Sequence, residues 1–351
     1  MKSVIPWRTV MARIRRELFS LSVVMDGLGK VGAKNGQKVI RMKIVIVGGS
    51  GFIGSAVVER LLSDGCDVIV LSRRKQGSLS SGDKTAQAVR WDARTSQALG
   101  SILEGVDAVI NLCGESVAAG RWTKSRKQIL YESRLVPTQA IVEAIGACKQ
   151  KPGVFINASA VGYYGDGADR LLDESAPKGD GFLADLCQAW EETALRARDF
   201  GVRTAVLRTG PVLDRGGFVE RMLPAFRFFI GGPIGCGRQW IPWIWRQDLA
   251  EAVNFVIRRA SLEGPVNCVG PEPVRMAEFC RLLGQAIGRP SWMPVPASAL
   301  RLVLGQMSEI LLKSQRVIPT KLSEAGFSCK IQTLTTVFDA ILTLGKPTHF
   351  R

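Results

Sequence analysis

The chain has almost no histidine and very little tyrosine. Of its 351 residues, one is a histidine, His349, and three are tyrosines. A zinc site built from imidazoles or a Ser-His-Asp triad needs histidine inside the fold, whereas His349 stands almost at the C-terminus. The sequence therefore argues against both kinds of centre, and we predict no metal site.

Long apolar runs and closely paired cysteines are missing too. No window reaches the roughly 18 apolar residues that a membrane helix needs. None of the eight cysteines forms a Cys-x-x-Cys pair, and most lie within apolar stretches. Such positions are typical of buried, reduced thiols in a reducing compartment. We therefore predict a cytoplasmic protein without a transmembrane segment.

Positive charge, in contrast, is in excess. Lys and Arg total 47 against 31 for Asp and Glu, a formal net charge of +16. Such an excess is typical of proteins that bind nucleic acid, an anionic membrane surface or an anionic ligand. Because no basic stripe is interleaved with aromatic residues, the sequence argues against nucleic acid. Residues 1–41 alone hold nine basic and two acidic residues. We interpret them as a basic extension: either an organelle-targeting segment, or a tail or start-site artefact before translation begins at Met42.

Short β-branched segments alternate with helical patterns over residues 43–208. The predicted strands cover 43–47, 67–71, 107–112, 153–158 and 203–208, and helical spacing is clearest over 55–63, 125–147 and 183–200. This order predicts a doubly wound parallel α/β sheet of the Rossmann type. After residue 210, Gly and Pro become frequent. We expect residues 42–210 to form a dinucleotide-binding domain. Residues 211–345 should then form a smaller substrate-side region that partly returns to the sheet.

A glycine-rich loop joins the first predicted strand to the first helix. Its residues are Gly48, Gly49, Ser50, Gly51, Phe52, Ile53 and Gly54. In such a loop the first glycine permits the tight turn, the second lets the backbone approach a pyrophosphate, and the third lets the helix pack on the strand. The free N–H groups at the helix start then hold the anion. We predict a dinucleotide phosphate site here.

The end of the second predicted strand indicates which dinucleotide is bound. An NAD site usually has Asp or Glu there to bind the ribose 2′-hydroxyl. This chain has Ser72, Arg73 and Arg74, and arginine can hold a 2′-phosphate through charge-assisted hydrogen bonds. We therefore favour NADP(H), with NAD(H) as the alternative. Further cofactor contacts are expected from Asp92, near the adenine, and from Leu112, Cys113, Gly114 and Glu115 after the third strand.

Several further motifs occur along the chain in addition to the glycine-rich loop. They include Asn111-Leu112-Cys113-Gly114-Glu115, Ser159-Ala160-Val161-Gly162-Tyr163-Tyr164-Gly165, Leu207-Arg208-Thr209-Gly210, Gly231-Gly232-Pro233-Ile234-Gly235 and Gln315-Arg316-Val317-Ile318-Pro319. From Met42 to about residue 345 the chain resembles the extended short-chain dehydrogenases/reductases. It is most similar to the epimerase family proteins, which carry a short C-terminal domain of unknown function. The resemblance implies NAD(P) binding and an oxidoreductase or epimerase reaction, and it names no substrate.

The catalytic residues of that family are incomplete here. Short-chain reductases generally use a tyrosine as acid/base, with a lysine four residues later that favours the phenolate. Tyr131, Tyr163 and Tyr164 are all followed at the fourth position by a residue other than lysine, and Phe182 stands where the tyrosine is expected. Where relatives usually have a histidine, this chain has Trp245.

Four other residues are the remaining catalytic candidates. Ser159 ends a predicted strand, where a substrate-orienting hydroxyl is expected, and Tyr163 and Tyr164 follow it closely. Lys127, in the preceding helix, is a candidate charge partner for either phenol. The alternative is that the tyrosines pack in the fold and Lys127 is a solvated surface residue.

Two hypotheses of function follow. The first is an NADP(H)-binding oxidoreductase or a nucleotide-sugar-epimerase-like protein that acts on a small substrate. The second is a cofactor-binding protein with little or no catalysis, such as a redox sensor or an assembly or division factor. Nucleic-acid binding rests on net charge alone, and a homodimer is left open.

Overall fold

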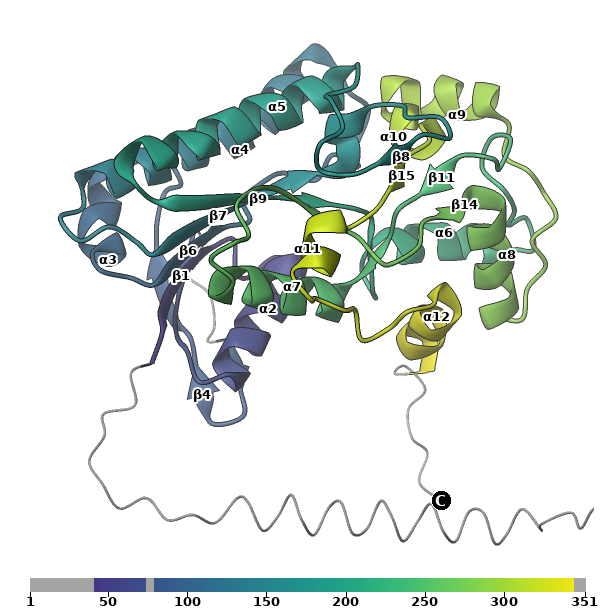
Figure 1. The fold of residues 1–351 in the computed structure, drawn as a ribbon. Coiled ribbons are helices and arrows are strands. Elements are labelled where there is room, and N and C mark those ends of the chain that lie inside the picture. Colours follow the sequence, from purple (N-terminus) through teal and green to yellow (C-terminus); the bar gives the residue numbers. More distant parts are fainter. Residues whose placement is uncertain (1–40, 74–78, 344–351) are drawn as a thin grey trace, which may run out of the picture. The chain divides into compact units, whose positions relative to one another are not determined.

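The architecture comes from a computed structural model, which describes residues 41–73 and 79–343 (Figure 1). The predictions for residues 1–40 and for Arg74 lie outside these residues. Arg41 begins a compact unit that includes the whole of the sheet and its flanking helices.

A seven-stranded parallel sheet forms the centre of this unit. Its order is β13-β9-β7-β6-β1-β2-β5, and each neighbouring pair is parallel. The strands are β1 (Lys43–Val47), β2 (Asp67–Ser72), β5 (Gln87–Arg90), β6 (Ala108–Asn111), β7 (Val154–Ala160), β9 (Arg203–Thr209) and β13 (Gly264–Cys268). The doubly wound Rossmann sheet predicted from the sequence is confirmed.

Helices cover both faces of the sheet because the strands are apolar on both sides. In β1, Ile44 and Ile46 face α2 (Phe52–Ser63) and α7 (Arg246–Arg258), which share one buried cluster with them. Val45 and Val47 point the other way, into a second cluster. That cluster includes residues of α3 (Gly100–Leu103), α4 (Lys124–Ala147) and α5 (Phe182–Leu195). Figure 1 shows α4 and α5 on one side of the sheet, and α2 and α7 on the other.

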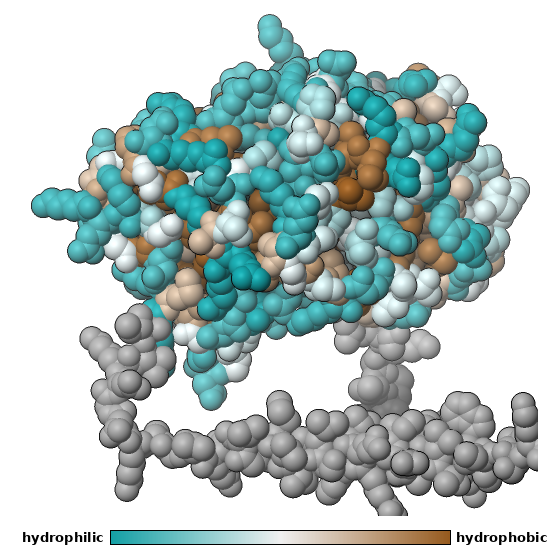
Figure 2. Space-filling view, in the orientation of Figure 1, coloured by the Kyte–Doolittle hydropathy of each residue, from teal (hydrophilic) through white to brown (hydrophobic). Residues whose placement is uncertain are grey.

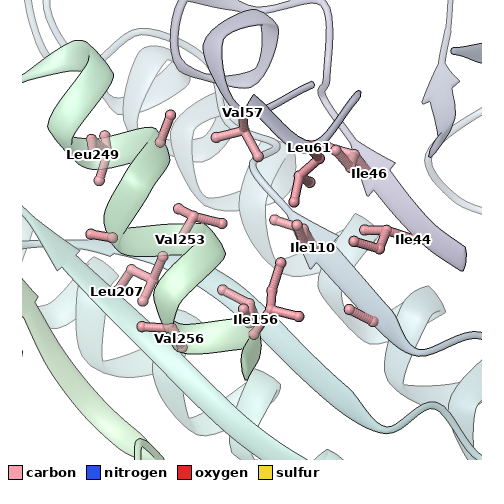
Figure 3. Close-up of a cluster of buried hydrophobic side chains, with 14 of the residues drawn as sticks. Ile44, Ile46, Val57, Leu61, Ile110, Ile156, Leu207, Leu249, Val253 and Val256 are labelled. Carbon is pink, nitrogen blue, oxygen red and sulfur yellow. The ribbon is translucent and has the colours of Figure 1, made fainter. Parts of the chain in front are cut away.

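The first of these clusters draws on distant parts of the chain. Figure 3 shows isoleucines of β1, β6 and β7 pointing toward side chains of α2 and α7. The labelled residues are Ile44, Ile46, Val57, Leu61, Ile110, Ile156, Leu207, Leu249, Val253 and Val256. Leu322, near the end of the chain, belongs to the same cluster. The core of the sheet is therefore complete only when the C-terminal part has returned to it.

Short elements make up most of the region after residue 210. They are β10 (Val212–Leu213), α6 (Phe218–Arg227), β11 (Trp240–Ile241), β12 (Ile244–Trp245), β14 (Val274–Arg275), α8 (Met276–Ala286), α9 (Ala297–Leu304), α10 (Glu309–Leu312), β15 (Arg316–Val317), α11 (Thr320–Glu324) and α12 (Leu334–Thr343). A third buried cluster joins α6, α8 and α12, with Phe279 at its centre. β15 pairs with β8 (Leu171–Leu172), and α11 packs on β13. A small hairpin, β3 (Ser80–Ser81) and β4 (Lys84–Thr85), lies beside α2.

Cysteines are mostly inside the fold, and the surface is mixed in character. All eight cysteines are unpaired, and five of them are buried. On the face drawn in Figure 2, apolar residues form separate small areas among hydrophilic ones. Among the described residues, no helix is long and apolar enough to cross a membrane, and no cluster of potential ligands could hold a metal ion.

Candidate functional site

The glycines of the loop between β1 and α2 have different surroundings. Gly48 has a φ of +80°, and a Cβ on it would lie 3.1 Å from the backbone of Leu112. On Gly54, a Cβ would lie 2.2 Å from the carbonyl oxygen of Gly48. A Cβ on Gly51, however, would have one neighbour within 4 Å among the described residues, that same oxygen at 3.3 Å. Gly48 is thus required by its backbone conformation and Gly54 by packing, whereas Gly51 is the least enclosed of the three.

The N-terminus of α2 has the features of an anion-binding site. Gly51 is the N-cap residue, it provides no capping side chain, and the first turn contains no acidic residue. Ser55 N–H makes a backbone hydrogen bond of the helix, to the Gly51 carbonyl at 3.0 Å, and the N–H groups of the first turn before it receive no capping side chain from Gly51. Helix N-termini of this kind carry a partial positive charge and bind phosphate through their free N–H groups.

Arg246, which sequence reasoning did not single out, holds this turn. Its Nε donates to the Phe52 carbonyl oxygen at 2.5 Å, and its Nη2 donates to Ser55 Oγ at 2.6 Å. Asp214 pairs with it at 3.2 Å. Arg246 begins α7, far from the loop in sequence, so no local motif could have shown this contact. It adds a fixed positive charge beside the first turn of α2.

Arg73 lies at the carboxyl end of β2, as the sequence predicts for a 2′-phosphate ligand. Its Nη2 is 3.5 Å from Glu115 Oε1, and the two side chains are 70% and 40% exposed. An exposed pair at this distance is weak. Arg73 and Glu115 therefore meet near the carboxyl edge of the sheet, with the guanidinium still open to solvent.

Asp92, predicted to lie near the adenine, binds its own turn after β5. Its Oδ1 accepts from the N–H groups of Arg94 and Thr95 at 2.8 and 2.9 Å, and its Oδ2 accepts from the Thr95 hydroxyl. These hydrogen bonds, the Thr95 hydroxyl foremost, lower the pKa of Asp92. The carboxylate thus fixes the shape of the turn at the edge of the sheet.

The loop after β6 passes over the phosphate loop, because Leu112 contacts Gly48. The Cys113 N–H donates to Asn111 Oδ1 at 3.1 Å, and the buried Asn111 is held by Thr138 and Asn157. Burial raises the pKa of Cys113 to about 11, so its thiol is neutral at physiological pH.

Gly114 and Glu115 continue this loop beside Arg134. A Cβ on Gly114 would lie 3.1 Å from the Arg134 guanidinium carbon, and Arg134 Nη2 donates to the Glu115 carbonyl at 3.0 Å. Burial lowers the pKa of Arg134. The loop is therefore held in place by Arg134.

Ser159 lies at the end of β7, but its hydroxyl points into the protein. It donates to Glu191 Oε1 at 2.6 Å. Arg208 donates to the same carboxylate from Nε at 2.9 Å and from Nη2 at 2.8 Å. All three residues are buried. The neighbouring position on the other side of the strand is Ala160, which has no hydroxyl to offer.

Tyr164 belongs to this same buried network. Its hydroxyl donates to Asn267 Oδ1 at 2.7 Å and accepts from Arg208 Nη1 at 3.0 Å. Burial raises the pKa of Tyr164 to about 12, although Arg208 opposes the shift. Burial alone would lower the pKa of Arg208, yet the Glu191 carboxylate raises it. These contacts suit a neutral phenol and a charged guanidinium that fix the geometry of the fold.

Tyr163 is only half-buried and differs from Tyr164. The Arg208 guanidinium lies over its ring at 3.4 Å, and the Tyr164 ring meets it edge-on at 5.5 Å. Within the described part of the chain, no residue forms a hydrogen bond with the Tyr163 hydroxyl. Lys178 lies within electrostatic range: the pKa of Lys178 is raised, first by Asp185 and to a smaller extent by Tyr163.

Lys127, a candidate charge partner for Tyr163 or Tyr164, contacts a different aromatic residue. Its ammonium group lies over the Phe182 ring, 5.0 Å from the centroid. Tyr131, one turn further along α4, meets the same ring edge-on at 5.8 Å. Burial, followed by Asp185, raises the pKa of Tyr131. The sequence did not indicate that this third phenol lies against Phe182, the residue in place of the expected tyrosine.

Trp245, which stands where relatives usually have histidine, ends β12 and pairs there with Leu213 of β10. Its side chain is partly buried against the cluster around Phe279. It is therefore a packing residue at the start of α7, next to Arg246.

Together, the parallel sheet, the glycine-rich loop between β1 and α2 and the arginine after β2 define the class of NAD(P)-binding Rossmann proteins of the extended short-chain dehydrogenase/reductase type. Residues 44–269 match the NAD dependent epimerase/dehydratase family, and residues 295–341 match a domain of unknown function named DUF1731. The chain belongs to the NAD dependent epimerase/dehydratase family, as its motifs led us to expect.

Similar proteins come from distant organisms. An epimerase family protein of Mycobacterium leprae is 41% identical over 83% of this chain and 92% of its own length. A chloroplastic epimerase family protein of Arabidopsis thaliana is 35% identical over 87% of this chain and 88% of its own length. The crystal structure of a human epimerase family protein with NADPH has a TM-score of 0.77 at 31% identity, and the match covers 86% of this chain and 99% of the human one.

Proposed function

We propose that this protein binds NADP(H) in preference to NAD(H) and uses it in an oxidoreductase or epimerase reaction on a small substrate. The observation that carries the proposal is the contrast within the phosphate loop. Gly48 has a positive φ and Gly54 leaves no room for a Cβ, whereas Gly51 is the least enclosed of the three, and we expect the pyrophosphate to approach there. The similar human protein, crystallised with NADPH, supports this use of the loop.

The preference for the phosphorylated cofactor rests on Arg73. It follows β2, the strand whose end faces the adenine ribose in Rossmann proteins. Its only ion pair with a described residue is the long contact with Glu115. A 2′-phosphate carries more charge than one carboxylate and would attract this guanidinium more strongly. Arg74 and Ser72 remain candidate ligands beside it.

In the proposed reaction, the buried candidates position the site rather than react. Ser159 and Tyr164 have their hydroxyls committed to Glu191, Arg208 and Asn267. Tyr163 is the better candidate acid because it is half-buried and near Lys178.

The second hypothesis, cofactor binding with little turnover, is favoured by one observation. Phe182 begins α5 within an apolar cluster with Trp122 and Leu186, so the usual position of the catalytic phenol is filled by a ring without a hydroxyl. A cytoplasmic location stays our expectation, with organelle targeting by the basic N-terminus as the alternative, and a homodimer is left open.

Cofactor choice is tested by titrating NADPH and NADH into the wild type and Arg73→Ala. Loss of one charged contact should cost about 1.5–3 kcal/mol, or roughly tenfold or more in the Kd for NADPH, with little change for NADH. Arg41→Ala is the matched control, because Arg41 forms a similar exposed pair with Asp67 at the opposite end of β1 and β2. Equal affinity of the wild type for both cofactors would contradict the proposal.

Catalysis is tested by reduction of a reactive dicarbonyl such as a quinone with NADPH. If Tyr163 is the acid, Tyr163→Phe should slow turnover by about 10²–10⁴-fold. Tyr131→Phe is the comparison, since it removes the other half-buried phenol. A fast wild type matched by both variants would show that another acid is used. No turnover in any protein, with tight NADPH binding retained, would favour the second hypothesis.

A further inference from the structure

Two neighbouring loop tips expose large apolar side chains to solvent. Phe228, Phe229 and Ile230 follow α6 and are 76%, 53% and 48% exposed. Trp292 and Met293, between α8 and α9, are 62% and 37% exposed. The Trp292 Nε1–H donates to the Phe229 carbonyl at 3.0 Å, so the two tips are joined. We call these five residues the apolar tip. Figure 1 shows α6, α8 and α9 at one end of the molecule, opposite α3.

The backbone at Phe229 is unusual for so large a residue. Phe229 has a φ of +63°. It occupies the left-handed position of a Schellman motif, in which Ile230 N–H donates to the Ala225 carbonyl at 3.0 Å and Phe229 N–H to the Phe226 carbonyl at 2.9 Å. Glycine is the usual residue there, because a side chain in this conformation is strained. The phenyl ring is therefore held outward against the local backbone preference, without being buried in return.

The amide groups of the apolar tip are already satisfied within the fold. Phe228 N–H donates to Pro224, and the N–H groups of Trp292 and Met293 both donate to the Gly231 carbonyl, at 3.1 and 3.2 Å. An unsatisfied amide is costly in hydrocarbon. This apolar tip could enter an apolar phase without exposing such a donor. A partner that adds a β-strand, in contrast, would need free backbone N–H groups on the surface where it binds. The hydrogen-bonded amides of the apolar tip do not favour such a partner.

The two stretches of sequence that carry the apolar tip hold charged residues of one sign. Residues 221–247 and 279–308 contain no Asp or Glu and carry seven arginines. Three of these flank the apolar tip and the helix after it, namely Arg227, Arg289 and Arg301, and all three are exposed. Among the ion pairs of residues 41–73 and 79–343, none involves these three. The Arg289 guanidinium lies over the Phe229 ring at 4.5 Å.

From these observations we infer that the apolar tip docks on the surface of an anionic lipid bilayer. Phe and Trp side chains bury in the interfacial layer, and the flanking arginines meet the lipid phosphates. The described part of the chain then binds the membrane from one side, since none of its helices is long and apolar enough to span a bilayer. The five residues of the apolar tip are separate from those of the phosphate loop.

The experiment is co-sedimentation of the full chain with vesicles of equal parts phosphatidylglycerol and phosphatidylcholine, and with phosphatidylcholine alone. We expect binding to the anionic vesicles that weakens in high salt. The double variant Phe228→Ala/Phe229→Gly should bind at least about tenfold less, because two apolar side chains no longer enter the lipid. It should not melt earlier, since glycine relieves the strained position. Leu171→Ala, at another exposed apolar side chain, is the control.

A second pair of variants tests the charge. Arg227→Gln/Arg289→Gln should lose most of the preference for phosphatidylglycerol, while Lys124→Gln/Lys149→Gln, which removes equal charge from exposed sites on and after α4, should keep it. The basic N-terminal residues are present in every variant, so differences report on the apolar tip alone. Undiminished binding by the Phe228/Phe229 variant, or none by the wild type, would overturn the inference. So would a wild-type dimer that the same variant dissociates, which would make a second copy the occupant.

Discussion

Gly51 and Gly54 stand three positions apart in the phosphate loop, and their surroundings predict opposite effects of the same substitution. Gly54→Ala places a methyl group 2.2 Å from the Gly48 carbonyl oxygen, so we expect a loss of about 1–3 kcal/mol in the free energy of unfolding. Gly51 has a φ of −74°, and a Cβ on it would lie 3.3 Å from the Gly48 carbonyl oxygen, which needs a shift of only a few tenths of an ångström. Gly51→Ala should therefore cost much less stability than Gly54→Ala and weaken NADPH binding at least about tenfold, because the methyl group would stand in the way of the pyrophosphate.

Chemical denaturation and NADPH titration of these two variants provide the check. A Gly51→Ala protein that binds NADPH like the wild type would show that the loop is not the phosphate site.

Tyr164 gives a second residue-scale prediction, at alkaline pH. Its pKa of about 12 in the folded protein lies above the value of about 10 for an unfolded tyrosine, so the folded state keeps the proton longer. The resulting stabilisation is present below about pH 10 and is lost as pH rises toward 12. Absorbance at 295 nm should show one of three phenols ionising last, and Tyr164→Phe should remove that step. A wild type whose phenols all ionise by pH 10.5 would contradict the burial of Tyr164.

Between elements, the buried ion pair of Glu191 and Arg208 ties α5 to β9. Replacing one partner alone leaves an uncompensated buried charge, so Glu191→Met or Arg208→Met should each cost about 3–5 kcal/mol. The double variant should be less destabilised than either single one, because two apolar side chains replace the charges. Equilibrium unfolding of the three variants measures the loss in the free energy of unfolding. If the loss in the double variant equals the sum of the two single losses, the pair is not coupled.

The elements differ in how far local sequence predicts them. Strands β1, β2 and β7 were expected because their apolar residues are continuous, and the phosphate loop because its glycines follow a strand directly. The contacts of the candidate catalytic residues could not be predicted in this way. The direction of the Ser159 hydroxyl is decided by Glu191, 32 residues later, and the first turn of α2 is held by Arg246, 194 residues from Phe52. No local pattern encodes which buried partner a side chain will meet.

On the scale of the whole molecule, the C-terminal region is part of the fold rather than an appendage. Phe338 of α12 is fully buried, and its ring meets that of Phe279 edge-on at 5.2 Å. Phe338→Ala should lower the free energy of unfolding by about 3–5 kcal/mol, while the Kd for NADPH stays near the wild-type value below the unfolding transition. Ile129→Ala, on the exposed surface of α4, is the control. A negligible stability change in Phe338→Ala would show that α12 does not close this cluster.

The order in which the strands join the sheet has a consequence for biosynthesis. α7 and β13 are separated from β1 by about two hundred residues of chain, and α11, which packs on β13, is made later still. A ribosome that adds roughly 5–20 residues per second needs tens of seconds to deliver them. During that interval α2 is the one helix of this face already made, and the isoleucines of β1, β6 and β7 still lack α7. We therefore expect the nascent chain to expose part of this apolar face until α7 leaves the ribosome.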